Sequence, residues 1–295
     1  MNILQAIILG IVQGLTEFIP VSSTAHLIFA TRLTGLSESL NAEQLTATIA
    51  VIQLGTLLAV FVYFARDIWG ISFAFARDHL MLLRGKTPPG VDGRGFFGSR
   101  MSPDASLGWL IIVGSIPIGV LGLALKKVIE GTFTKNLWVI ATMMIVVAAF
   151  LLIAERVGSK RRGMEDLTLK DALAVGFAQV LALIPGASRS GSTIMGGLFA
   201  GEKRETAARF SFLLSIPAIA ASGLLELKEA LHKLPQGSGP QLVVATIVAC
   251  VVGYASIWFL LRFLRTHSTG VFIAYRVVVA ALILLLLYGG VINPL

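Results

Sequence analysis

The chain has few charged residues and a single cysteine. Of its 295 residues, 14% are charged and 56% are hydrophobic. Windows of about 20 apolar residues recur, which is the length that an α-helix needs to cross a bilayer, and the alternating segments of a β-barrel are absent. Cys250 has no second cysteine with which to form an intrachain disulfide, and we expect it to be a small core residue of a membrane span. The sequence therefore predicts an all-α polytopic membrane protein.

Six full membrane spans are predicted from the apolar windows, at about 43–65, 107–125, 136–154, 206–225, 241–261 and 271–289. Two further apolar regions are each interrupted by a proline. The first comprises 1–18 and 20–34 around Pro20, and the second comprises 170–184 and 190–200 around Pro185. Non-helical backbone at membrane depth is tolerated only where protein or a cavity surrounds it. Each broken region is therefore predicted to be a re-entrant helix–loop–helix pair.

Lysine and arginine are unevenly distributed over the polar connections. Six of them lie on one side of the predicted bundle, and 16 lie on the other, in 66–106, 156–170, 201–209 and 262–270. The positive-inside rule makes the second side cytoplasmic. Both termini then face outward, the first broken pair enters from outside, and the second enters from the cytoplasm. The net charge of +8 is accordingly loop charge, and no nucleic-acid partner is expected.

The longest polar connection, 66–106, divides into two parts. Residues 66–84 combine Trp69 and Phe73 with three arginines, a composition that suits a cytoplasmic helix lying in the membrane interface. Residues 85–106 are rich in glycine and proline and are predicted to form a loose loop. We expect the histidines in predicted loops and interface regions to be solvated, namely His79, His232 and His267.

The two halves of the chain resemble each other. A Gly-x-x-Gln motif, followed by Ile-Pro and a Ser/Thr cluster, begins at Gly10 and recurs at Gly176. Each half, about 1–155 and 170–290, holds one broken pair and three spans. Because three is odd, the second half must be inverted relative to the first. We therefore predict one membrane domain built from an inverted-topology repeat, an architecture known from secondary transporters.

The second broken pair contains an arginine in apolar surroundings. Arg189 is the only formal charge between residues 172 and 201. An arginine at the bilayer centre costs about 2.5–3.5 kcal/mol, so it indicates a functional site with a partner to be found. A helix is predicted to begin near Ser192, and both helix N-termini and arginine bind anions. We therefore predict an anion site at Arg189 with the neighbouring hydroxyl and glycine residues Gly186, Ser188, Ser190 and Thr193.

The first broken pair supplies an acid and a base. Gln13 and Glu17 are four residues apart, so they share one face of a helix. A buried carboxylate without a partner would protonate, and Arg189 from the opposite half is the expected partner of Glu17. His26 follows a turn of hydroxyl residues, and we predict that it belongs to the same site. The alternative is a purely structural ion pair that locks the two loops together.

Three motifs resemble the signatures of the bacterial undecaprenyl-diphosphatase family, the bacitracin-resistance proteins BacA, over nearly the whole chain: Gln13-x-x-x-Glu17, Pro20-Val21-Ser22-Ser23-Thr24-Ala25-His26 and Pro185-Gly186-Ala187-Ser188-Arg189-Ser190. The resemblance implies hydrolysis of undecaprenyl diphosphate to the monophosphate and inorganic phosphate. That reaction recycles the carrier lipid for peptidoglycan synthesis and confers bacitracin resistance. The resemblance also implies a bacterial inner-membrane location, with an active site that opens to the outer, periplasmic face.

The resemblance implies catalytic roles for Glu17, Ser23, His26, Ser188 and Arg189. The remaining polar groups of the two loops are expected to bind the polyprenyl diphosphate, namely Gln13, Ser22, Thr24, Gly186, Ser190 and Thr193. The leading position of the first motif is Glu or Gln in the family, and Gln13 leaves a single acid in this chain. A divalent cation, Mg²⁺ or Ca²⁺, would help to neutralise the diphosphate, with Glu17 as its only evident acidic ligand.

The sequence leaves the nucleophile and the function class open. Either Ser23 or a water attacks, activated by His26 or Glu17, and our first hypothesis is Ser23 with His26 as proton shuttle. A secondary transporter or flippase for an anionic lipid or solute is the alternative function. A membrane phosphatase of the PAP2 type shares the reaction, but the chain lacks its Lys/Arg-Pro and Ser-Gly-His motifs. The expected partners are the lipid substrate and the bilayer. The sequence does not decide whether the protein forms a homodimer.

Overall fold

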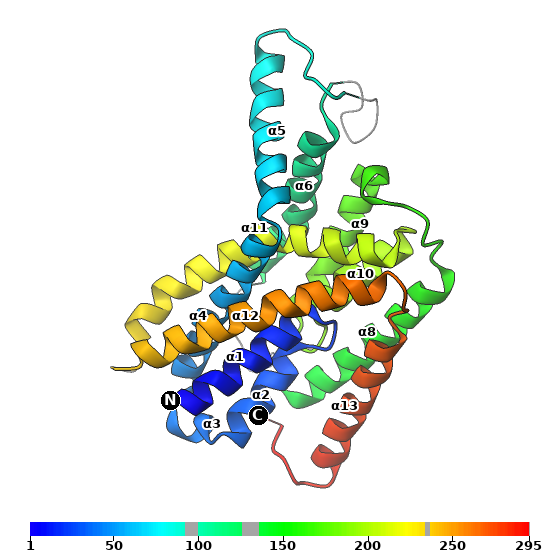
Figure 1. The fold of residues 1–295 in the computed structure, drawn as a ribbon. Coiled ribbons are helices and arrows are strands. Elements are labelled where there is room, and N and C mark those ends of the chain that lie inside the picture. Colours follow the sequence, from blue (N-terminus) through cyan, green and yellow to red (C-terminus); the bar gives the residue numbers. More distant parts are fainter. Residues whose placement is uncertain (92–99, 126–135, 234–236, 295) are drawn as a thin grey trace.

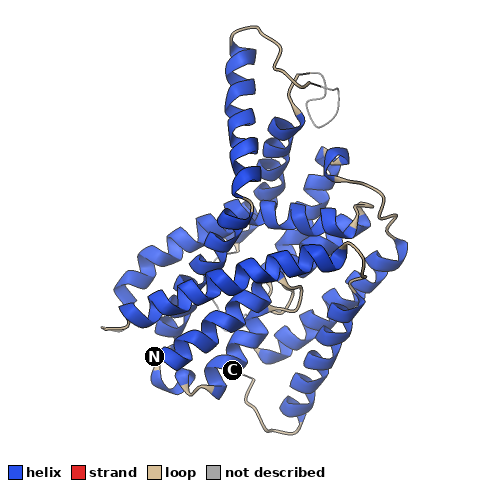
Figure 2. Cartoon of the chain, viewed as in Figure 1, coloured by secondary structure: helices blue, strands red, loops and turns tan. Residues whose placement is uncertain are grey.

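The computed structural model describes residues 1–91, 100–125, 136–233 and 237–294, and the regular elements in these residues are helices (Figures 1 and 2). In chain order they are α1 (Ile3–Phe18), α2 (Ser23–Leu33), α3 (Leu36–Ser39), α4 (Ala42–Tyr63), α5 (Ala65–Leu83), α6 (Pro103–Ala124), α8 (Leu137–Val157), η2 (Met164–Asp166), α9 (Leu169–Val180), η3 (Leu181–Leu183), α10 (Arg189–Phe199), α11 (Arg204–Lys233), α12 (Gly239–Leu264) and α13 (Gly270–Tyr288).

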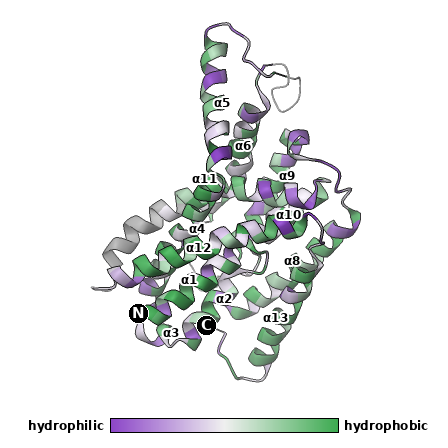
Figure 3. Cartoon of the chain, in the orientation of Figure 1, coloured by the Kyte–Doolittle hydropathy of each residue, from purple (hydrophilic) through white to green (hydrophobic). Residues whose placement is uncertain are grey.

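Five described helices, α4, α6, α8, α12 and α13, are long and apolar enough to cross a membrane. They match five of the six predicted spans, and much of the surface of α12 and α13 is hydrophobic (Figure 3). The sixth predicted span, 206–225, lies inside α11, which is not among the five. α11 is a 30-residue helix, and some of its side chains lie outside the described residues, so the sixth span stays a prediction. The chain is a multi-pass membrane protein.

Both proline-interrupted regions form broken helix pairs. α1 ends at Phe18 and α2 begins at Ser23, and Pro185 lies between η3 and α10. The helix after the second loop begins earlier than the predicted position near Ser192. Ser188 caps it, because its Oγ accepts a hydrogen bond from the backbone N–H of Gly191 at 3.2 Å. Arg189 is therefore the first residue of α10, at the positive end of the helix dipole.

Each broken pair packs on a span from the other half of the chain. α1 contacts α12, and a Cβ at Gly10 would come within 2.6 Å of the carbonyl oxygen of Ala245. α9 contacts α6, and a Cβ at Gly176 would come within 2.3 Å of the carbonyl oxygen of Gly114. Only glycine permits such close backbone contact. This reciprocal packing, α1 on α12 and α9 on α6, is the arrangement that an inverted repeat would produce.

α5 projects from the bundle beside the first half of α6 (Figure 1). Asp78 on α5 is buried and accepts hydrogen bonds from the backbone N–H and the hydroxyl of Ser102, at 2.8 and 2.6 Å. His79 is half-buried, and its Nε2 accepts a hydrogen bond from Trp109 Nε1 at 3.1 Å. The prediction that His79 is solvated was therefore wrong, because α5 packs on α6. Trp69 remains exposed on the outer face of α5.

The structure also gives the exposure of the two other residues for which the sequence made a prediction, His267 and Cys250. His267 is exposed, as predicted, and Cys250 is half-buried in α12, where it packs at the edge of the largest apolar cluster. The side chain of His232 and the segment 92–99 of the predicted loose loop lie outside the described residues. The predicted interfacial position of residues 66–84 stays a prediction.

Glu202 is a buried acid at the end of the second broken pair, between α10 and α11. Its side chain is fully buried, and neither carboxylate oxygen has a hydrogen-bond partner in the described part of the chain. Arg162, the nearby cation, donates to both carboxylate oxygens of Asp171 at 2.6 Å. Burial raises the pKa of Glu202 to about 8, and Asp171 adds to the rise while Arg162 opposes it. Glu202 is therefore mostly protonated at neutral pH.

Glu202→Gln is expected to make the protein more thermostable at high pH than at low pH, relative to the wild type. The unfolded chain loses this proton near pH 4.3 and the folded chain near pH 8, so the folded state binds more protons between these values and wild-type stability falls as the pH rises. Melting curves in detergent should show a gain from pH 5 to pH 8 of at least about 2 °C. The exposed Glu38→Gln is the control, and a gain independent of pH would contradict the assignment.

Candidate active site between the two broken helix pairs

The two loops meet through an ion pair between Glu17 and Arg189. Nη2 of Arg189 donates to Oε1 of Glu17. The side chain of Arg189 is 16% exposed, and that of Glu17 is 6% exposed. Gln13 Nε2 donates to the other carboxylate oxygen at 3.0 Å. Phe18, the next residue on α1, packs edge-on against Phe212 of α11 with ring centroids 5.4 Å apart. The partnership expected from the sequence is therefore confirmed, and packing fixes the end of α1 that carries the acid.

A serine with positive φ precedes the second helix of each pair. Ser22 has φ 77° and Ser188 has φ 68°, and Lys160 is the other described non-glycine residue with positive φ. Such conformations cost about 1–3 kcal/mol each and persist where the surroundings enforce them, often at functional sites. Ser22 is buried, and its Oγ has no hydrogen-bond partner among the described residues. The equivalent strain at both loops indicates that their backbones are held in place from outside.

Arg276 on α13 holds both loops. It is fully buried and donates to the carbonyl oxygens of Pro20 at 3.3 Å, Gly186 at 2.9 Å and Ala187 at 3.0 Å. This residue was not predicted from the sequence, although it is the only charge in the predicted span 271–289. The reasoning applied to Arg189, that a lone charge in an apolar segment needs a function, would have found it. Arg276 binds backbone carbonyls in place of a carboxylate.

His26 makes two hydrogen bonds, and Ser23 contributes to neither. The imidazole Nδ1 lies 2.7 Å from the carbonyl oxygen of Ser22, and Nε2 lies 2.7 Å from the hydroxyl of Tyr275 on α13. Ser23 is half-buried at the start of α2. Within residues 1–91, 100–125, 136–233 and 237–294, its hydroxyl has no hydrogen bond to His26 or Glu17. The contact required for activation of Ser23 is therefore not formed in this structure.

The other predicted residues differ in accessibility. Thr24 is exposed, and Ser190 is buried with its Oγ 3.2 Å from Ser188 Oγ. Gly186 has φ 90°, and a Cβ there would lie 2.2 Å from the carbonyl oxygen of Ile140, so only glycine fits. Thr193 is fully buried and donates to the Arg189 carbonyl at 2.8 Å. Gly186 and Thr193 therefore shape the loop, while Arg189 lies at the N-terminal end of α10, where the helix dipole favours an anion.

The comparison with known proteins identifies the family. The profile described as "Bacitracin resistance protein BacA" matches residues 6–282. The chain belongs to the BacA family. A protein named undecaprenyl-diphosphatase from Syntrophobacter fumaroxidans is 49% identical over 98% of both chains. Proteins of the same name from Nocardia farcinica and Myxococcus xanthus are 46% and 47% identical, over 99% and 100% of this chain and 98% and 92% of the relatives.

The polar groups of this BacA-family site do not make a metal centre. Glu17 is the carboxylate at the junction, and its two oxygens are engaged by Arg189 and Gln13. No group of three or more His, Cys, Asp or Glu side chains able to hold an ion occurs in the described ranges. A hard cation such as Mg²⁺ prefers several oxygen ligands, and one engaged carboxylate does not supply them. We therefore derive no step through a cation.

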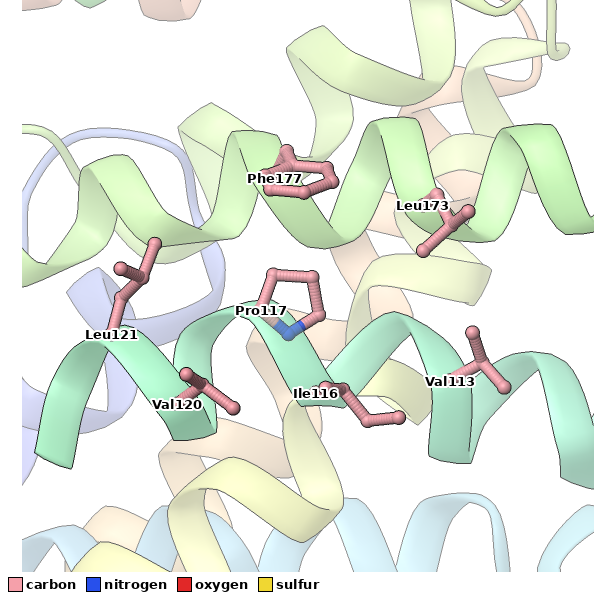
Figure 4. A pocket seen from close by; sticks show the side chains of 7 residues that line it. All are labelled: Val113, Ile116, Pro117, Val120, Leu121, Leu173 and Phe177. Carbon is pink, nitrogen blue, oxygen red and sulfur yellow. The ribbon is translucent and has the colours of Figure 1, made fainter. Parts of the chain in front are cut away.

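An apolar groove of about 350 Å³ lies between α6 and α9 (Figure 4). Its lining side chains are Val113, Ile116, Pro117, Val120, Leu121, Leu173 and Phe177. α9 leads through η3 into the loop that carries Arg189. A Cβ at Gly122 would lie 3.7 Å from Leu183 in η3, so the α6 end of the groove approaches the start of that loop. The groove offers an apolar surface to lipid chains beside a helix of the site.

Proposed function

We propose that this chain hydrolyses undecaprenyl diphosphate to undecaprenyl phosphate and inorganic phosphate at the junction of its two broken helix pairs. The full-length similarity to proteins named undecaprenyl-diphosphatase supports the reaction. The contact between Glu17 and Arg189 is the observation that carries the site, because it joins residues 172 positions apart. The junction has a guanidinium at a helix N-terminus, and the loop after Glu17 adds hydroxyls and the imidazole of His26. These are the groups that phosphoryl transfer needs for charge neutralisation and proton transfer.

The substrate diphosphate competes with Glu17 for Arg189. In the free protein the guanidinium is engaged by one carboxylate, and a diphosphate offers more negative charge and more acceptor oxygens to the same fork. The first N–H groups of α10 add to this electrostatic binding. Attack on the terminal phosphorus, by Ser23 or by water, forms a new P–O bond while the anhydride P–O bond breaks. The departing undecaprenyl phosphate takes the electron pair of that bond, and His26 takes the proton of the attacking oxygen. If Ser23 attacks, water then cleaves the phosphoserine P–O bond, the Ser23 oxygen takes the electron pair and a proton, and inorganic phosphate leaves.

The product recycles the carrier lipid for peptidoglycan synthesis, and the activity confers bacitracin resistance. Loop charge supports a site that opens to the outer face, since the connections with 16 Lys and Arg residues then lie in the cytoplasm. The reciprocal packing of the two halves supports the inverted repeat, with repeat one at about 1–155 and repeat two at about 170–290.

Ser23→Ala is expected to lower kcat for phosphate release at least about tenfold if Ser23 is the nucleophile. The side chain lies at the first turn of α2, next to the strained Ser22, where it can approach a phosphoryl group. The assay measures phosphate release from undecaprenyl diphosphate in detergent, with the exposed Ser37→Ala on α3 as control. Near-normal turnover of the variant would exclude the covalent route and leave water as the attacking group.

A transporter or flippase for an anionic lipid is the second candidate, because the reciprocal packing of α1 on α12 and α9 on α6 resembles transporter architecture. Transport requires binding and two compartments, whereas hydrolysis requires neither a second compartment nor movement of the lipid. Phosphate release in micelles therefore separates the two functions.

A further inference from the structure

Tyr275 lies beside His26 although it comes from the last helix of the chain. Its hydroxyl oxygen is 2.7 Å from Nε2 of His26, and the two rings are nearly parallel, with 11° between their planes and centroids 5.6 Å apart. Tyr275 is 43% exposed and precedes Arg276, which binds the carbonyl oxygens of both loops. α13 therefore contacts the site through two consecutive residues, one at the loop backbone and one at the imidazole.

The two hydrogen bonds of His26 define its tautomer. A carbonyl oxygen only accepts, so Nδ1, which lies 2.7 Å from the Ser22 carbonyl, carries the hydrogen. In the neutral ring Nε2 then holds the lone pair, and the Tyr275 hydroxyl donates to it. When His26 takes a proton, Nε2–H donates and the same hydroxyl oxygen accepts. Tyr275 can therefore bond to both protonation states without moving its oxygen.

We propose that Tyr275 links the attacking oxygen to His26: the Tyr275 hydroxyl passes its hydrogen to Nε2 while its oxygen takes the proton of the attacking oxygen, and the new Nε2–H then donates to the same oxygen. This inference rests on the proposed function, because it takes His26 as the group that accepts the proton. The backbone of Ser22 orients one side of the ring and Tyr275 orients the other. A hydrogen bond to a charged group is stronger than one between neutral groups, so Tyr275 favours the protonated ring. Burial lowers the pKa of His26, the hydrogen bond to the Ser22 carbonyl raises it, and the charge of Arg276 lowers it.

The first test is a double-mutant cycle on phosphate release, with Tyr275→Phe, His26→Gln and the combination. Tyr275→Phe alone should lower kcat about tenfold while KM stays within about twofold, because substrate binding does not use this hydroxyl. In the His26→Gln background the same change should alter kcat by less than about twofold, because two residues that act through one another are not additive. An equal loss in both backgrounds would overturn the proposal, and so would full activity of Tyr275→Phe.

Tyr288→Phe is the matched control, because Tyr288 lies on the same helix as Tyr275. Its ring contacts Trp138 of α8, with centroids 4.9 Å apart, and not His26. Its kcat and melting temperature should equal those of the wild type. The acid limb of the pH–rate profile should move to lower pH in Tyr275→Phe and stay unchanged in Tyr288→Phe. A merely structural role of Tyr275 would lower the melting temperature without moving this limb.

A second measurement does not depend on catalysis. The imidazole ¹⁵N resonances of the solubilised protein, followed against pH, report the titration midpoint of His26. The His26 resonances are identified as those that disappear from the spectrum of His26→Gln. The midpoint should fall in Tyr275→Phe, because the acceptor for Nε2–H is lost, and an unchanged midpoint would overturn the proposal. If the wild type releases no phosphate while the midpoint still shifts, the proposed function fails and the contact between Tyr275 and His26 stands.

Discussion

Arg189→Lys is expected to lower kcat/KM for phosphate release from undecaprenyl diphosphate at least about 100-fold. Arg189 is the first residue of α10, and its guanidinium contacts Glu17 across the junction of the two loops. Lysine keeps the charge but replaces a planar fork, which binds two phosphate oxygens at once, with a point charge. The loss of one charge-stabilising donor in a transition state typically costs about 10²–10³ in rate.

The control for Arg189→Lys is Arg265→Lys, because Arg265 is exposed and pairs with Glu205 away from the loops. Both variants should be compared at equal amounts of folded protein, measured by melting in detergent. Activity of Arg189→Lys within about threefold of the wild type would contradict the role of Arg189 as the phosphate clamp.

Glu17→Gln is expected to cripple turnover to a similar extent, about 100-fold or more. The carboxylate is buried, accepts from Arg189 and Gln13, and is the acid of the junction. Glutamine has the same shape but binds the guanidinium more weakly, so Arg189 loses the carboxylate that holds it in position at the junction. Loss of one partner of a buried pair destabilises a protein by about 3–5 kcal/mol, so part of the effect would appear as a lower melting temperature.

Phosphate release and melting temperature together separate the roles of Glu17. A catalytic Glu17 predicts low turnover per folded molecule, whereas a structural Glu17 predicts a lower melting temperature with normal turnover of the folded fraction. Glu38→Gln, at an exposed position of α3, controls for the loss of an acid. A Glu17→Gln variant that is fully active and stable would contradict both the catalytic and the ion-pair interpretation.

Much of the helical arrangement could be predicted from the sequence, because membrane spans are set by hydrophobic length. Five predicted spans coincide with apolar helices, and both proline interruptions separate helices. α11 shows the limit of this approach. The apolar window 206–225 is part of a longer helix that begins at Arg204 and ends at Lys233, and a window read alone does not show that the helix continues into polar sequence.

The central pair of the site was also predictable, since Glu17 and Arg189 are charges in apolar segments that each need a partner, and those segments offer few. Arg276 stands out in the sequence as the lone charge of its span, but its partners could not be predicted, because they are backbone carbonyls. The contact between His26 and Tyr275 joins residues 249 positions apart, and no local pattern indicates it. The positive φ angle of Ser22 arises from tertiary packing, since serine shows no intrinsic preference for that conformation.

Phosphate release by the purified protein in detergent micelles separates hydrolysis from transport. Undecaprenyl diphosphate is supplied in a single compartment, so transport cannot produce the signal. The account predicts steady phosphate release by the wild type, lost in Arg189→Lys and Glu17→Gln and retained in Arg265→Lys. Binding of the lipid by folded wild-type protein without any phosphate release would contradict the account and favour a transporter or flippase.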